Sequence, residues 1–262
     1  MLSGKSVFAE IFDNDEAFRL FCSIAASDEA QGGWENAKIA ARVPASLQHL
    51  APKIARHGAD EDKHGRIFSA LLRNRGLEPV PVSPHLDYTM RLEHLGVGLA
   101  HSRLRGGGEL TERDIIAYLV HSRVTEQRAA EQMRSLLAYA GDHQEVGRAI
   151  RVISRDEDNH LAYCHEELLK LAAAGHRDTL RRALSATALA EIAVYRDVSE
   201  GVIARMGRIL RWPRWKLAVL MAAVEATYGY ERLGGWRRMV SLRMPAKRDP
   251  LGGHAPADTP FG

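Results

Sequence analysis

Apolar residues recur at every third or fourth position through four long stretches of the chain, which is the spacing of one face of an α-helix. The stretches cover about residues 13–43, 46–76, 111–141 and 150–175. Residues that favour helix caps stand near the start of the first three, and Pro or Gly stands near the ends, where helices usually stop. The pattern predicts four long helices.

Further helices are predicted outside these four stretches. Residues 178–211 and 213–233 keep the helical spacing, and Pro213 suits a first helical turn. Residues 77–110 contain three prolines and later a run of three glycines, which indicates a long crossover with one further helix over about 85–103. The predicted fold class is therefore all-α, with two additional C-terminal helices after the first four.

Positive charge is concentrated in the C-terminal part of the chain. Residues 205–248 hold eleven Lys or Arg against two acids, although the net charge of the whole chain is only +3. Three regions are predicted from this: a helical bundle over 1–175, a basic helical extension over 176–248, and a tail over 249–262. The tail is rich in Pro and Gly and lacks apolar periodicity, so disorder is expected there.

Neither a membrane segment nor a leader peptide is indicated by the sequence. The longest uncharged apolar stretch, residues 217–224, is far shorter than the roughly 20 residues that span a bilayer. The N-terminus is not followed by a signal-like apolar block. We therefore expect a cytoplasmic protein.

Charged residues interrupt the apolar faces of the predicted helices, most clearly in two similar pentapeptides. One contains Glu61 and His64, and the other contains Glu157 and His160. Residues three apart on a helix point in nearly the same direction, about one turn from each other. Each Glu-x-x-His pair is thus suited to bind one metal ion from a single helix.

A single acid lies on the apolar face of each of the other two long helices. Glu126 and Glu157 are each about 15 residues from the turn that joins their helices, and Glu29 and Glu61 are about 15 and 17 residues from theirs. In antiparallel helices such residues lie at one level. Glu35 is closer to its turn and faces the polar side, so we interpret it as a solvated acid.

Four buried carboxylates require compensating charge, because an uncompensated charge is costly to remove from water. Two divalent ions balance four carboxylates, and two neutral imidazoles complete the set of ligands. The two cysteines, Cys22 and Cys164, cannot form a multi-cysteine site and are interpreted as small buried hydrophobes. The sequence therefore predicts two metal ions held by carboxylates and imidazoles.

This pattern resembles the ferritin-like di-iron carboxylate superfamily over about residues 13–175. The metal ligands that the resemblance implies are Glu29, Glu61, His64, Glu126, Glu157 and His160. It also implies a four-helix bundle with a long crossover, two Fe ions, with Mn or a mixed Mn/Fe pair as alternatives, and O₂ as co-substrate. No catalytic residue beyond the ligands is implied.

The Asp before each Glu is similar to the form found in bacterial multicomponent monooxygenases. There this Asp is a hydrogen-bond partner of a ligating imidazole, which implies that Asp60 serves His160 and Asp156 serves His64. The usual Arg before the His is Lys63 in the first copy and Asn in the second. Asp62 and Asp158 are expected to face elsewhere.

The resemblance implies an O₂-dependent oxygenase or oxidase that acts on a small-molecule or carrier-bound organic substrate and needs an electron donor. Iron oxidation and storage is the first alternative, and a tRNA-modifying hydroxylase that uses the basic C-terminal region is the second. A metal-stabilised helical binding protein without turnover also remains open. Exposed Glu-x-x-His pairs on polar helices would need no metal at all.

Two smaller features each allow a structural and a functional reading. Trp212, Trp215 and Trp236 alternate with Lys and Arg, a composition that suits nucleic acid or a membrane surface, although core or homodimer contacts are favoured. Gly32 and Gly33 leave space beside Glu29, either for O₂ or substrate or, as favoured, for close helix packing.

Overall fold

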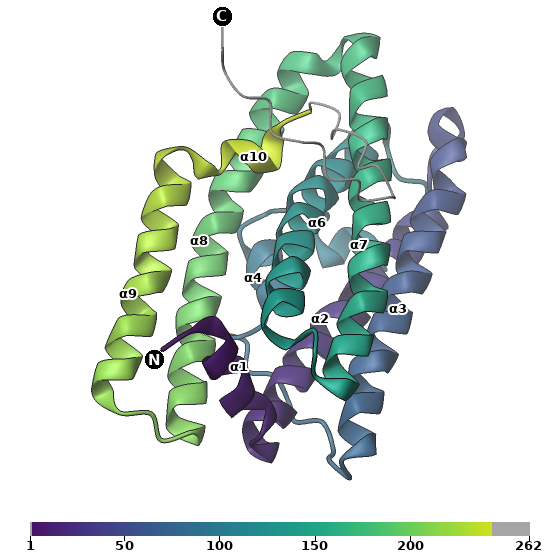
Figure 1. Cartoon of the computed structure of the whole chain (residues 1–262). Helices are drawn as coiled ribbons and strands as arrows, with labels where there is room; N and C mark the ends of the chain where they lie inside the picture. Colours follow the sequence, from purple (N-terminus) through teal and green to yellow (C-terminus); the bar gives the residue numbers. More distant parts are fainter. Residues whose placement is uncertain (1, 243–262) are drawn as a thin grey trace, which may run out of the picture.

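The computed structural model describes residues 2–242, and all regular structure in this part of the chain is helical (Figure 1). This confirms the prediction of an all-α protein. The helices are α1 (Gly4–Phe12), α2 (Asp15–Ala40), α3 (Ala51–Asn74), α4 (Tyr88–His94), α5 (His101–Arg105), α6 (Glu112–Ala140), α7 (Gln144–Leu171), α8 (Arg177–Ile209), α9 (Arg214–Tyr230) and α10 (Arg237–Val240). The predicted tail, residues 249–262, lies outside the described residues.

The four predicted long helices correspond to α2, α3, α6 and α7, with differences at their starts. The Thr111 side chain caps α6 as predicted, in a reciprocal capping box with Asp114. The cap of α2 is Asn14 rather than either neighbouring Asp. The start predicted for α3 near Ser46 is wrong, because residues Ala45–Leu50 form a 3₁₀ segment and α3 begins only at Ala51.

Short helices account for the largest errors of the sequence prediction. The helix α1 was not predicted; it is capped by Ser3 and packs against α2 and α6. The single helix predicted over 85–103 is wrong, because this segment forms α4 and α5 with a break between them. Gly96 and Gly98 at the break have φ angles of 71° and 83°, which a right-handed helix does not allow.

The long helices pack side by side around a polar centre. The helix α2 packs on α3, α6 packs on α7, and α3 also contacts α7. Two clusters of buried apolar side chains lie beyond the two ends of this centre: Ile54 and Leu168 belong to one, and Phe68 and Ile153 to the other. On α3 and α7 the Glu-x-x-His pairs lie between these clusters, so apolar packing positions them from both ends.

Glycines allow α2 and α3 to approach each other closely. A Cβ atom at Gly58 would lie 2.9 Å from Asn36 Cβ and 3.2 Å from the carbonyl oxygen of Gly33. A Cβ at Gly32 would lie 3.6 Å from Glu61 Cγ, which is ordinary contact. Close packing, the interpretation favoured for Gly33, agrees with this geometry, while Gly32 also borders a cavity described below.

The C-terminal helices cover one side of the long helices. The helix α8 contacts α6 and α9 packs on α8, at one edge of the molecule in Figure 1. Trp212 and Trp236 pack against the apolar clusters, whereas Trp215 is 61% exposed. The predicted division of the chain into a helical bundle over residues 1–175 and a basic extension over residues 176–248 stays a prediction. None of the helices within residues 2–242 combines the length and the apolar composition needed to cross a membrane.

Candidate metal centre

The six residues predicted as ligands come together from α2, α3, α6 and α7, in the middle of the molecule. They form two overlapping groups that share Glu61. One group contains Glu29, Glu61, His64 and Glu157, and the other contains His57, Glu61, Glu126 and His160. Within each group, one potential ligand atom per residue lies within 4.8 Å of the others. Each group can hold one metal ion.

The first group surrounds the Nδ1 atom of His64. This atom lies 3.2 Å from Glu29 Oε2, 3.4 Å from Glu157 Oε1 and 3.9 Å from Glu61 Oε2. Ligand atoms at about 2.1 Å from one ion lie about 3 Å apart when they subtend a right angle. The observed separations therefore fit a shared cation.

The second group includes a histidine that the sequence analysis missed. His57 Nε2 lies 2.9 Å from Glu61 Oε1 and 3.1 Å from Glu126 Oε1. The ring of His57 stacks on that of His160 at a centroid distance of 3.9 Å, and His160 Nδ1 lies 3.5 Å from Glu61 Oε1. The available signal was spacing, because His57 stands one helical turn before Glu61 on the same face.

Each of the imidazoles of His57, His64 and His160 turns one ring nitrogen toward the central glutamates and the other away from these glutamates. His64 Nε2 lies 3.1 Å from Asp156 Oδ2, within hydrogen-bond distance, as the resemblance implied. His160 Nε2 lies 3.6 Å from Asp60 Oδ2, which is too long for a hydrogen bond. Asp156 thus lies within hydrogen-bond distance of its predicted histidine, whereas Asp60 does not.

Lys63 joins the two aspartates beside the centre. Its ammonium group donates to Asp60 Oδ1 at 2.8 Å and to Asp156 Oδ2 at 2.6 Å. Burial alone would raise the pKa of Asp60, but Lys63 and Arg56 outweigh it and hold that pKa at about 2. The pKa of Asp156 is also lowered by Lys63, although burial opposes this, so Lys63 helps to keep both carboxylates ionised.

The carboxylates at the centre cannot all carry charge without a cation. Burial, followed by the neighbouring carboxylates, raises the pKa values of Glu29 and Glu157 well above the usual value. For Glu126 the effect of burial is overcome by His57 and His160, and its pKa is lowered. The nearby carboxylates of Glu126 and Glu157 raise the pKa of His160 to about 9 in spite of burial. Protons therefore occupy the places where cations would bind.

Unsatisfied polar atoms provide a direct test of whether the residues fit a metal. Buried polar atoms in folded proteins almost always have a hydrogen-bond partner. Glu126 Oε2 and both ring nitrogens of His160 are buried and have none. A metal ion could supply the missing partner for Glu126 Oε2 and His160 Nδ1, and a set of carboxylate and imidazole ligands would suit iron or manganese.

Other acids on the same helices lie outside both groups. The prediction that Glu35 is solvated is wrong: its side chain is 13% exposed and its Oε1 lies 2.7 Å from His101 Nε2. His101, from the distant helix α5, takes the place of water beside the Glu35 carboxyl group. Asp62 is exposed and the Asp158 side chain is 59% exposed, so both face away from the centre as expected.

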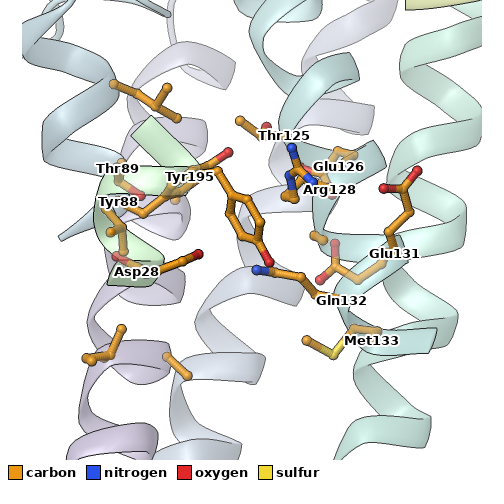
Figure 2. Close-up of a pocket in the computed structure, with 18 of the residues that line it drawn as sticks. Asp28, Tyr88, Thr89, Thr125, Glu126, Arg128, Glu131, Gln132, Met133 and Tyr195 are labelled. Atoms are coloured by element: carbon orange, nitrogen blue, oxygen red, sulfur yellow. The ribbon is translucent and has the colours of Figure 1, made fainter. Parts of the chain in front are cut away.

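A cavity of about 990 Å³ borders the centre. Its wall includes the four central carboxylates and a mixture of apolar and polar side chains from α2, α4, α6, α8 and α9. Figure 2 shows part of this pocket, where Asp28, Tyr195 and Gln132 extend into it from different helices. The central carboxylates thus lie on the wall of a space large enough for a small organic molecule.

Comparison with known proteins identifies no relative: no family model, curated protein or solved structure matches the chain.

Proposed function

We propose that the chain is a ferritin-like dimetal enzyme, with iron as the favoured metal, that uses O₂ to oxidise an organic substrate. The observation that carries this proposal is the pair of buried His/Glu groups that share Glu61 on the wall of a large cavity. A purely structural ion would need no such cavity.

The chain's own residues divide into those that hold metal and those that orient them. Two iron ions bound by the two groups would supply the electron transfer to O₂ that side chains cannot perform. Asp156 accepts from His64 Nε2–H, which leaves the Nδ1 lone pair facing the carboxylates. Glu61, shared by both groups, would hold the two ions close together.

The cavity supports oxidation of an organic substrate over simple iron oxidation and storage. Pockets for small molecules usually enclose about 300–1,000 Å³ and are mostly apolar. The observed volume of about 990 Å³ lies at the upper end of this range. This size favours a bound organic molecule, since the ions of an iron-storage protein need no comparable space beside the centre.

Metal analysis tests the ligand set. We expect the chain expressed in iron-replete medium to carry about two ions, because two divalent ions balance the charge of four carboxylates. Glu29→Ala should lower the metal content, whereas Glu35→Ala, on the same helix but paired with His101, should leave it unchanged. Absence of stoichiometric iron or manganese, or loss of metal only in the Glu35 variant, would refute the proposal.

Oxygen consumption tests the activity. The anaerobic chain loaded with ferrous iron should consume O₂ when air is admitted, and should consume it repeatedly when an electron donor is supplied. An iron-storage protein would instead accumulate ferric iron well beyond two ions per chain. Such accumulation, without repeated O₂ use, would favour the alternative function.

A further inference from the structure

The arginines that line the cavity already have acidic partners. The Arg128 guanidinium donates to Glu191 Oε1 at 2.7 Å and to Glu231 Oε1 at 2.8 Å. Arg238 donates to Glu131 Oε1 at 2.8 Å, and the third lining arginine is bound to an aspartate. An anionic substrate would therefore meet no free arginine among the described residues of this wall.

The acids of the wall are also paired, with one exception outside the metal centre. Glu131 and Glu231 bind arginines, and Glu35 lies beside His101. Asp28, on α2, also lines the cavity, and its Oδ1 is buried and has no hydrogen-bond partner. The cavity wall thus contains one carboxyl group with an oxygen that lacks a donor.

We propose that this cavity binds an organic amine, whose nitrogen donates a hydrogen bond to the Asp28 carboxyl group while its apolar part lies along the cavity wall. The inference rests on the proposed function, because it names the substrate class of that site. A cationic nitrogen compensates a buried carboxylate, and a charge-assisted hydrogen bond is about twice as strong as a neutral one.

The surroundings of Asp28 suit this kind of ligand. Figure 2 shows the Tyr195 and Gln132 side chains reaching into the same pocket as Asp28, so the wall offers further polar atoms to a ligand. Apolar side chains, Ile24 and Val202 among them, form much of the remaining wall. The ligand is therefore an amine with an apolar body, not a polyamine or an amino acid with a free carboxylate.

Binding of three ligands that share one carbon skeleton tests the inference. The probes are 4-phenylbutylamine, 4-phenylbutan-1-ol and 4-phenylbutanoate, measured by calorimetry with both metal-free and Mn²⁺-loaded chain. We expect the amine to bind at least about tenfold more tightly than the alcohol, as for a hydrogen bond to a charged group, and the acid to bind most weakly. This series tests the unmodified chain and does not depend on a variant that folds.

Two variants test whether the nitrogen of the bound amine contacts Asp28. Asp28→Asn should abolish the preference for the amine, whereas Glu225→Gln, at an exposed acid of α9 that does not line the cavity, should retain it. Equal or tighter binding of the acid in the unmodified chain would overturn the inference. A preference for the amine that survives Asp28→Asn would also overturn it, since the nitrogen would then bind elsewhere, such as to a metal ion.

Metal content measured on the same samples separates the two proposals. A chain that binds no stoichiometric metal but prefers the amine through Asp28 would refute the proposed enzyme and leave the amine site intact. A chain that binds two metals and shows no preference for the amine would refute the amine site alone.

Discussion

At the scale of single residues, His57 connects the candidate metal centre to a buried pair of tyrosines. Its Nδ1 lies 2.8 Å from the Tyr163 hydroxyl and 3.2 Å from that of Tyr118, and the two hydroxyls are 2.6 Å apart. If Nδ1–H donates to Tyr163, the Nε2 lone pair faces Glu61 and Glu126. The tyrosines then hold His57 in the tautomer that binds a metal ion.

Substitution of His57 tests this role. In His57→Ala the group that contains Glu126 and His160 should bind its ion at least about tenfold more weakly, and the other group should bind as before. Titration with Mn²⁺, followed by electron paramagnetic resonance, measures the two affinities. His85→Ala, at an exposed histidine, is the matched control. Two ions bound with unchanged affinity would show that His57 is not a ligand.

At the scale of elements, the contact between α2 and α3 sets the distance between Glu29 and the Glu61–His64 pair. The helices approach through Gly33 and Gly58, which have no side chains to separate them. Any residue larger than Gly at this contact must move one helix relative to the other, because packed interiors leave no room.

The variant Gly58→Ala should destabilise the fold by about 1–3 kcal/mol, since its Cβ would overlap Asn36, although Ala is the better helix former. Gly229→Ala on α9 is the matched control: no atom lies within 4 Å of the added Cβ, and a gain of up to about 1 kcal/mol is expected. Urea unfolding measures both changes. A Gly58 variant as stable as the control variant would contradict the close approach.

At the scale of the whole molecule, protons and metal ions compete for one centre, so stability depends on pH. The pKa of His160 is raised to about 9, and the pKa values of Glu29 and Glu157 are raised well above the usual carboxyl value. A group with a raised pKa stabilises the fold fully below its unfolded value and loses this contribution as the pH rises through the folded value. For His160 the window is from about 6.5 to about 9.

The metal-free chain should therefore lose stability as the pH rises from about 6.5 to 9, with a fall in Tm of at least about 2 °C. The lowered pKa of Glu126 does not oppose this, since its contribution changes only below about pH 4.5. The metal-loaded chain should show a smaller fall, because cations replace the protons. Calorimetry with and without a chelator gives both curves; a Tm of the metal-free chain that rises over this range would contradict the assignment.

Local spacing was sufficient to predict the long helices and to place six of the seven residues of the centre. Helical geometry relates residues three and four apart directly, so Glu61 and His64, or Glu157 and His160, share a face wherever the helix packs. The same rule applies to His57, which stands four residues before Glu61 but belongs to neither Glu-x-x-His pair and was not predicted. The short helices α1, α4 and α5 lack a long periodic pattern.

Contacts between distant segments could be known only from the folded chain. The bond from His101 to Glu35, the bridge from Lys63 to Asp156 and the unpartnered Oδ1 of Asp28 each depend on how separate helices pack. Residue spacing along one helix carries no information about the rotation and distance of the next helix. The six predicted ligand positions thus follow from spacing along each helix and from the distance of each acid to its turn, whereas the cavity beside them arises from the packing of α2, α4, α6, α8 and α9.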